Sequence, residues 1–500
     1  MKKSTLLLTL ASIALPTYAQ TSPAPVQERD PLQNEASMPN INQKNLKEDL
    51  LRKQRLSEQN AMAQENQANG NSVARFTGKQ LAENPALLER LFLEALVNPN
   101  KAVLPVYIKI YESVPNADLS LIDWGKAILE REEDLNKSIA SYRKLISDFP
   151  ENNFIRYQLA ETLFYNQEYE AAKTQFERLR ASTKNAQDIA VFDKYIEVID
   201  SKENWNFSFS TTFLNDKNLA NSAKQGTKMA IGSGEITYNT PRQTGQGLGL
   251  SVGADKRWSL SNGKYVAFDS SVNTRYYWDN KKYNDVIGHV GLGYGYSDAR
   301  FNVQVTPYIN KRWYGGGLNG GDSLKQYTDT YGASLSMGYW LSQNFKYSAF
   351  YNFGYERYRK EVDKLNYNGA VHSLTNSLMF IPSSTQFWSI SLDLTKKYAA
   401  DRSNAYNRIG TRLTWGQEWP LGITTSTTLG YAKRNYLEQS FIGMKQRNNE
   451  YSASVSLWHK QFHYAGFTPK VTWSYSKTKS NMAIYSYDKN QVFIEVGKSF

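Results

Sequence analysis

The sequence contains no cysteine among its 500 residues. This absence excludes disulfide bonds, thiol catalysis, thiolate metal ligands and the acylated cysteine of a lipoprotein. Long apolar runs are also missing, since no segment approaches the roughly 20 consecutive apolar residues that a transmembrane helix needs. The catalytic patterns GxSxG, HExxH and GxxxxGK followed by Ser or Thr are absent too. We therefore expect neither an enzyme nor a helical membrane anchor.

Histidine is scarce as well, with four residues in the whole chain. His459 and His463 flank a predicted turn in WHKQFHYAG and could offer two imidazoles to a metal ion. No carboxylate cluster accompanies them, so we expect an interfacial or loop role, with neither a metal site nor a cofactor. The other two, His289 and His372, lie in predicted strands. The glycine-rich stretch GGGLNGG, residues 315–321, predicts a turn or an extracellular loop.

The charge balance is moderately basic: 59 Lys and Arg residues against 47 Asp and Glu residues give a formal net charge of +12. Such a balance could indicate nucleic acid or anionic lipid. The basic residues are scattered and no block of five or six occurs. We therefore expect no nucleic acid partner, whereas the anionic headgroups of outer-membrane lipid are compatible with this charge.

The N-terminus has the pattern of an export signal. A basic start, an apolar run at residues 6–15 and a cleavage site ending at Ala19 predict a signal peptide over residues 1–19. The mature chain would begin near Gln20. Residues 20–74 are rich in Gln, Asn, Glu, Lys and Pro, which predicts a polar leader that is largely disordered. The stretch NLKEDLLRKQRLSEQNAMAQ within it could form a solvated or docking helix.

Residues 75–201 show helical periodicity, with apolar residues three and four positions apart. A period of 34 residues runs through this region: Ser138 recurs as Ala172, and Tyr142 recurs as Phe176. A small residue followed four positions later by an aromatic is typical of tetratricopeptide repeats. LPVYIKIYESVPN, one period upstream, indicates a degraded earlier repeat. We expect a small all-α solenoid that binds a protein.

From residue 202 to residue 500 the period changes to two. In NWNFSFSTTFL, Trp205, Phe207 and Phe213 share one face, whereas Ser, Thr and Asn occupy the other. This alternation predicts a transmembrane antiparallel β-barrel of about 14 strands. Aromatic residues near strand ends, as in RYYW at 275–278, are expected at the membrane interfaces. The predicted strands are 203–214, 246–258, 262–277, 283–296, 300–313, 326–341, 344–358, 370–381, 385–398, 405–418, 422–434, 449–460, 467–478 and 491–500.

The last ten residues, QVFIEVGKSF, form an alternating strand that must pair with the first strand, because an open edge cannot remain in hydrocarbon. Val492, Ile494, Val496 and Phe500 share its apolar face. A terminal aromatic on such a strand resembles the signal by which the barrel assembly machinery recognises its clients, so we assign these four residues as an assembly signal. Lys498 departs from that pattern and could snorkel to the interface. A soluble all-β sandwich is the alternative, but so many Ser and Thr residues would underfill its core.

The order of these parts resembles the surface lipoprotein assembly modulator (Slam) family. The stretches that carry the resemblance are SIASYRKLISDFPENNFIRYQLAETLFYNQEYEAAKTQFERL, the junction ENWNFSFSTTFLNDKN and the ending FIEVGKSF. The resemblance implies outer-membrane translocation of particular surface lipoproteins or secreted haemophores, with the helical domain in the periplasm of a Gram-negative bacterium. It also implies a role in iron or haem acquisition, and it supplies no catalytic residues.

On this basis we hypothesise that the helical domain receives the client, alone or with a periplasmic chaperone, and that the barrel gives an exit path without nucleotide energy. Client contacts are predicted on the inner faces of the first helix of each repeat. In the alternative interpretation, these side chains only pack against the next helix. The predicted client-binding residues are Tyr157, Glu161, Phe164, Tyr165, Ala127 and Arg131.

Two other function classes remain open. A polysaccharide export pore also joins tetratricopeptide repeats to a barrel, although with a far longer superhelix than two or three repeats. A passive porin or receptor would use the helical domain only as a tether. A polysaccharide synthesis operon beside the gene would favour the first class, and channel conductance that survives deletion of residues 21–200 would favour the second.

Overall fold

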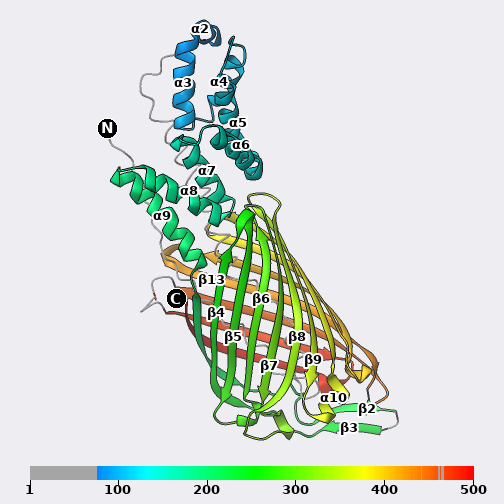
Figure 1. Cartoon of the computed structure of the whole chain (residues 1–500). Coiled ribbons are helices and arrows are strands. Elements are labelled where there is room, and N and C mark those ends of the chain that lie inside the picture. The colour runs from blue at the N-terminus through cyan, green and yellow to red at the C-terminus, as the bar shows by residue number, and fades with distance from the viewer. Residues whose placement is uncertain (1–75, 233, 441, 460–461, 463–466, 500) are drawn as a thin grey trace.

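The structure is a computed structural model that describes residues 76–499, apart from 233, 441, 460–461 and 463–466. A helical region is followed by a closed antiparallel β-barrel, and the helices lie at one end of that barrel (Figure 1). This arrangement confirms the predicted fold class. The predicted signal peptide and leader lie outside the described residues, as do His463 and Phe500.

The helices repeat with the predicted period. The first helices of three successive pairs begin at Pro85, Leu119 and Asn153, which are 34 residues apart. None of the helices in the described part of the chain is long and apolar enough to cross a membrane. The helices of this region are α2 (Gly78–Ala82), α3 (Pro85–Val97), α4 (Leu104–Tyr111), α5 (Leu119–Glu133), α6 (Leu135–Asp148), α7 (Asn153–Tyr165), α8 (Tyr169–Ser182) and α9 (Ala186–Glu203).

A side-chain cap precedes each of these starts. Asn84, Asp118 and Asn152 accept hydrogen bonds from backbone N–H groups in the first turns of α3, α5 and α7. Asn185 does the same for α9. Such caps satisfy N–H groups that have no partner within the helix, and each contributes about 1 kcal/mol. α9 therefore begins like a further first helix of the series, and the chain then passes into the barrel.

The helical core forms where the predicted small and aromatic residues meet. Tyr142, Phe176, Ser138 and Ala172 are all fully buried. The Ser138 hydroxyl donates a 2.7 Å hydrogen bond to the carbonyl of Ala127, so this buried polar group has a partner. The tetratricopeptide prediction is thus confirmed at the positions that defined it.

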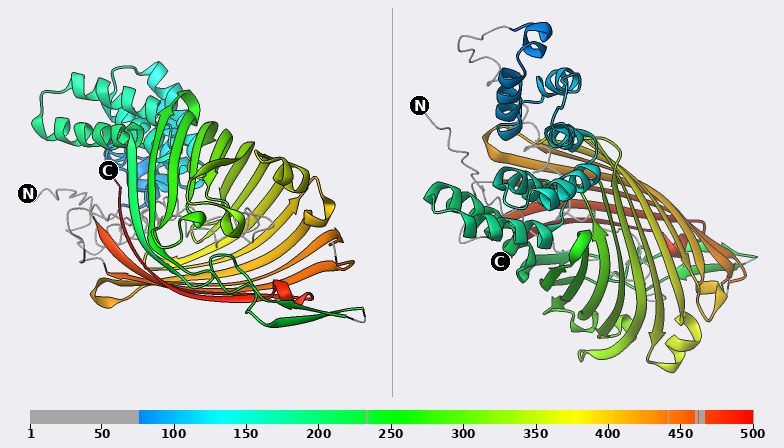
Figure 2. Two further views of the ribbon diagram at one scale, coloured as in Figure 1. Left: turned by 90° about the horizontal axis from the view of Figure 1, so that it is seen from below. Right: turned by 45° about the horizontal axis from the view of Figure 1, so that its top comes forward.

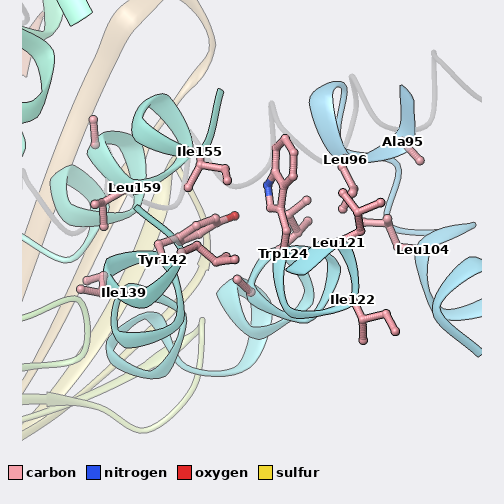
Figure 3. Packing of buried hydrophobic residues seen from close by; sticks show 14 of the residues in the cluster. Ala95, Leu96, Leu104, Leu121, Ile122, Trp124, Ile139, Tyr142, Ile155 and Leu159 are labelled. Atoms are coloured by element: carbon pink, nitrogen blue, oxygen red, sulfur yellow. The ribbon is translucent and has the colours of Figure 1, made fainter. Parts of the chain in front are cut away.

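A buried amide connects three successive helix pairs. The side-chain oxygen of Gln158 accepts from Trp124 Nε1 at 2.7 Å and from the Tyr142 hydroxyl at 3.1 Å. Its nitrogen donates to the Leu96 carbonyl at 2.8 Å. Figure 3 shows Trp124 between Tyr142 on one side and Leu96 on the other. The repeats are therefore joined by hydrogen bonds as well as by apolar packing.

Within the described residues, fourteen strands close the barrel, and each pairs antiparallel with its neighbours. Figure 2 shows the curved wall from two further directions, with the helices over one end. Every strand predicted from the sequence corresponds to one of these. The barrel strands are β1 (Asn206–Asp216), β4 (Gly245–Ser259), β5 (Lys264–Tyr277), β6 (Asp285–Ser297), β7 (Phe301–Tyr314), β8 (Lys325–Trp340), β9 (Phe345–Tyr358), β10 (Gly369–Ser383), β11 (Gln386–Lys397), β12 (Tyr406–Glu418), β13 (Ile423–Gln439), β14 (Lys445–His459), β15 (Thr468–Ser480) and β16 (Tyr487–Ser499).

A small hairpin outside the barrel was not predicted. β2 (Thr227–Ile231) and β3 (Gly234–Tyr238) pair with each other in the long connection between β1 and β4. They contact the short 3₁₀ helix η7 (Ala483–Tyr485) at the end of the barrel away from the helical region, and helix α10 (Glu361–Tyr367) lies at that same end (Figure 1). Their strands are short and mostly exposed, so they lack the long alternation that marks the wall.

The wall has the predicted alternation of faces. On β11, Ile390 and Leu392 point outward and are exposed, whereas Ser391 and Asp393 point into the lumen and are buried. This apolar exterior and polar interior are those of a membrane-spanning barrel.

The expectation that aromatic residues at strand ends all lie at the membrane interface was wrong in part. In RYYW, Tyr276 and Trp278 are exposed on the outside, but Tyr277 is buried on the luminal side. Tyr358 and Tyr406, at other strand ends, are also buried. Because neighbouring residues on a strand point to opposite faces, two adjacent tyrosines cannot both reach the lipid.

Candidate functional site

Four of the six predicted client-binding residues come together around Glu161. The Tyr157 hydroxyl donates to Glu161 Oε1 at 3.0 Å, and Arg131 Nη1 lies 3.5 Å from Glu161 Oε2. Tyr195 on α9 donates to the same Oε1 at 2.9 Å. The Phe164 ring packs edge-on against the Tyr195 ring, with centroids 5.1 Å apart. These five residues, called the Glu161 cluster below, join α5, α7 and α9.

The two tyrosine hydroxyls of the cluster stay protonated. Burial raises the pKa of both Tyr157 and Tyr195, and the nearby charge of Glu161 raises each pKa further. Both hydroxyls therefore remain protonated at physiological pH and continue to donate to the carboxylate. A carboxylate held by two hydroxyls and a guanidinium is an oriented acceptor for any partner that reaches it.

The remaining two predicted residues lie differently. Tyr165 is 36% exposed and packs against Phe164, so it extends the aromatic surface of the cluster. Ala127 is fully buried and offers no surface to a partner. Tyr195 was missed by the sequence reasoning, although it lies 34 residues after Glu161 and so holds the same place in the repeat.

Hydrogen bonds attach the helical region to the adjacent end of the barrel. The α7–α8 corner and the end of α5 meet the turn between β6 and β7. The bonds run from Gln167 Nε2 to the Asp298 carbonyl (2.8 Å), from Ala299 N–H to Asn166 Oδ1 (3.3 Å), and from Arg300 Nη2 to the Glu133 carbonyl (3.1 Å). At the end of β4, Ser259 N–H donates to Glu203 Oε1 of α9 at 3.1 Å. The repeats are therefore held over this end of the lumen by specific contacts.

Ion pairs line the lumen near the other end. Asp285 receives Arg275 and Arg312, each at 2.6 Å, and all three side chains are almost fully buried. Further pairs follow around the wall and bridge strands that are adjacent or one strand apart. They are Asp329 with Arg359, Glu356 with Lys397, Asp393 with Arg412, and Glu450 with both Arg408 and Arg434. These ion pairs cross-link neighbouring strands of the wall. Loss of one partner would leave a buried charge without compensation, which is strongly destabilising.

The closing strand places its apolar residues as predicted. Val492 and Ile494 are 55% and 53% exposed on the outer face, and Val496 lies on the same face, partly exposed. Glu495 points to the opposite, luminal side, where it pairs with Lys470 at 2.7 Å. The fourth residue of the proposed assembly signal, Phe500, lies outside the described residues.

The seam between β1 and β16 is paired along only part of its length. The backbone ladder runs from Ser208 opposite Ser499 to Phe213 opposite Ile494. On its other side, β1 pairs with β4 over its whole length. Beyond the ladder, Lys489 Nζ donates to Asp216 Oδ2 at 2.7 Å, and both side chains are buried. Where the backbone hydrogen bonds between β1 and β16 stop, a side-chain ion pair connects the two strands.

The three histidines that the structure describes do not gather into a metal centre. Among the described residues, no group of three or more His, Asp or Glu residues could hold a metal ion. His289 lies in the lumen between Asp269 Oδ2 and Asn310 Oδ1, both at 2.6 Å from its ring nitrogens. The ring of His459 packs against Phe462.

Family comparisons match both parts of the chain. Residues 205–500, which include the whole barrel, match the family described as "Surface lipoprotein assembly modifier". Residues 74–176 match "Surface lipoprotein assembly modifier, N-terminal TPR repeats".

Individual relatives extend over most of the chain. The Surface lipoprotein assembly modifier 2 of Haemophilus influenzae is 39% identical over 431 residues, covering 86% of this chain and 88% of that protein. The Surface lipoprotein assembly modifier 1 of Neisseria meningitidis is 32% identical over 438 residues, covering 86% of each. The Hemophilin secretion modulator of Acinetobacter baumannii is 22% identical over 447 residues, covering 84% of this chain and 86% of that protein.

Proposed function

Because the chain belongs to the surface lipoprotein assembly modifier family, we propose that it translocates specific surface lipoproteins, or secreted haem- and iron-acquisition proteins, from the periplasm to the cell surface. It is an outer-membrane protein of a Gram-negative bacterium, with its helical repeats in the periplasm. The observation that carries the proposal is that family descriptions match the repeats and the barrel separately. The name of the Acinetobacter relative supports a haem-binding client.

The proposal divides the work among the parts of the chain. Residues 1–19 direct export and are removed, and residues 20–74 form a polar leader. Residues 75–201 receive the client, and residues 202–500 form the membrane path. The contacts between the α7–α8 corner and the β6–β7 turn support this order, because they hold the receiving surface over the periplasmic end of the lumen.

Client capture is assigned to the Glu161 cluster together with Tyr165. The cluster presents aromatic rings beside an oriented carboxylate, a combination that can hold an extended segment by ring packing and hydrogen bonds. The Ala127 side chain is buried in the helical core, so it supports the packing of the repeats and is left out of the capture surface.

Further partners belong to the same proposal. A periplasmic chaperone would deliver the client to the repeats, and the barrel assembly machinery would recognise the closing strand through Val492, Ile494, Val496 and Phe500. Outer-membrane lipid would surround the apolar outer wall.

Surface display tests the function directly. The chain would be expressed in a laboratory Gram-negative host with each lipoprotein or secreted haem-binding protein encoded beside its gene, and intact cells would be probed with antibody and protease. We expect one neighbour to reach the surface or medium only when the chain is present. If no neighbour depends on it while the barrel is folded in the outer membrane, the proposed function is wrong.

The capture surface is tested by Glu161→Gln combined with Tyr165→Ala. These changes remove the charge and an exposed ring, so we expect client display to fall severalfold at an unchanged amount of folded protein. The matched control is Glu177→Gln with Phe154→Ala, which makes equivalent changes at exposed positions outside the cluster. Equal display by both double variants would contradict this assignment.

A further inference from the structure

An open hollow of about 320 Å³ lies on the outer face of the wall, across strands β9 to β13. The row of residues nearer the β11–β12 connection is called the upper row. Its members lie opposite one another in register on consecutive strands: His372, Lys396, Asn407 and Asn435. The row below it is apolar over three strands, with Leu374 opposite Leu394 and Leu394 opposite Ile409. Lys433 continues this lower row on β13, opposite Ile409. The hollow therefore combines two lysines and polar side chains with an apolar floor.

The hollow lies at the level of the outer leaflet. Lys396 is the residue before the last of β11, and Asn407 is the second residue of β12. The connection between these strands is at the barrel end that carries α10, opposite the helical region (Figure 1). Since the helical repeats are periplasmic, this end faces the cell exterior. The two lysines are thus placed at the outer headgroup region, and the apolar row is placed next to the acyl chains.

The lysines of the hollow have no carboxylate partner within the part of the chain that the structure describes. Lys396 is exposed and lies 4.9 Å from the centroid of the Tyr398 ring, and Lys433 is exposed without an ion pair. The adjacent Lys397 points into the lumen, where it donates to Glu356 at 2.8 Å. The wall therefore supplies an acidic side chain to the inward lysine and none to the outward pair. Outward cations at a membrane surface are stabilised by anionic headgroups.

More basic residues continue the positive surface beyond the hollow. Arg447 on β14 and Lys477 and Lys479 on β15 are all exposed. The register places Arg447 opposite Asn435, and places Lys479 opposite Asn449 beside Lys433. This positive surface faces the outer leaflet and spans adjacent strands, so it suits a ligand that carries more than one negative charge.

We propose that the hollow binds the phosphorylated glycolipid of the outer leaflet, lipopolysaccharide. Its phosphates lie between Lys396 and Lys433, and its acyl chains cover Leu394 and Ile409. A lysine ammonium is a compact charge suited to phosphate oxygens, and the apolar row below matches the chains that a free phosphate lacks. β11 lies on the far side of the barrel from the β1–β16 seam in the strand order. The bound lipid therefore anchors the wall that faces away from the seam.

Native mass spectrometry of the purified full-length protein in detergent tests this site. The probes are lipopolysaccharide with phosphorylated lipid A, the same preparation with those phosphates removed, and phosphatidylglycerol. We expect saturable binding of the phosphorylated form. Lys396→Gln with Lys433→Gln should weaken it about thirtyfold, the effect of losing two lysines near a charged lipid surface.

Two variants and a folding check make the result decisive. Lys396→Arg with Lys433→Arg keeps both charges and should retain binding. Lys256→Gln removes an outward lysine at the periplasmic end, where it lies near Trp205 and Trp258, and should leave binding unchanged. Heat-modified migration on gels confirms that each barrel is folded.

Three outcomes would overturn the assignment. They are equal binding by the wild type and the glutamine double variant, equal binding of the dephosphorylated glycolipid, and equally tight binding of phosphatidylglycerol. The last would mean that the surface accepts any anionic headgroup.

Discussion

At the scale of single residues, Gln158 shows how a repeat core can depend on one amide. Gln158→Met would keep the side-chain volume but leave the Trp124 indole N–H and the Leu96 carbonyl without this partner. Each buried polar group left unpaired costs about 1–3 kcal/mol. Unfolding of the helices in the full chain would be followed in urea by far-ultraviolet circular dichroism. We expect the urea concentration at the midpoint of this transition to fall clearly.

The same substitution at an exposed glutamine provides the comparison. Gln187→Met on α9 changes the same atoms at the surface and should leave the midpoint within experimental error. Similar shifts for both variants would show that the buried network does not stabilise the repeats.

Individual residues also show why part of the site escaped prediction. The 34-residue period placed Glu161 and Arg131 on one surface. Tyr195 escaped it because the small and aromatic residues that mark a repeat lie on the second helix of each pair, and α9 is followed by β1 instead of such a helix. The charge pairs of the lumen could not be assigned, because alternation identifies a luminal residue without identifying its partner. Asp216 and Lys489 are 273 residues apart and become neighbours only when the barrel closes.

At the scale of elements, the β1–β16 seam is the place where the wall depends most on side chains. Asp216→Asn would leave Lys489 buried without its carboxylate, a change that costs about 3–5 kcal/mol in buried pairs. We expect hydrogen–deuterium exchange in β1 and β16 to accelerate at least tenfold, because their shared ladder ends at Phe213 and Ile494. Exchange in β9 to β11 should not change.

A second buried carboxylate separates a seam effect from general destabilisation. Asp393 accepts from Arg412 Nε at 2.7 Å between β11 and β12, whose ladder extends from Gln386 to Lys397. Asp393→Asn should leave the exchange of β1 and β16 as in the wild type. Acceleration of the seam by both variants would mean that the Asp216 pair has no special role there.

The environment of a strand decides whether the alternation of apolar and polar residues can predict it. Each wall residue meets either lipid or lumen, so the alternation predicted every barrel strand and the positions of Ile494 and Val496 on the closing strand. The β2–β3 hairpin has no such two-sided environment, and its exposed five-residue strands carry no comparable signal. Strand prediction therefore succeeded where the membrane imposes two chemically different faces.

At the scale of the whole molecule, the placement of the repeats over the lumen depends on a few hydrogen bonds. Asn166→Ala with Gln167→Ala removes two of the bonds to the β6–β7 turn. We expect the distance distribution between spin labels at Lys184→Cys and Leu421→Cys to broaden. The absence of native cysteine makes these two labels unique.

Gln187→Ala, which changes a residue of α9 that has no bond to this turn, is the control for the placement experiment. It should preserve the width of the distribution. A narrow distribution in the Asn166 and Gln167 double variant would show that the two remaining bonds, from Arg300 to Glu133 and from Ser259 to Glu203, are enough to hold the repeats.

The junction between α9 and β1 has a mechanical consequence. α9 ends at Glu203 and β1 begins at Asn206, so two residues connect a stiff helix to the strand at the seam. One of them, Trp205, stacks on Phe207 and meets Trp258, which fixes that end of the connection to the wall. Because the connection is this short, α9 cannot move far without moving the start of β1. A rotation of α9 would therefore be transmitted to two neighbouring wall strands at once, to β1 through the two-residue connection and to β4 through the Glu203–Ser259 hydrogen bond.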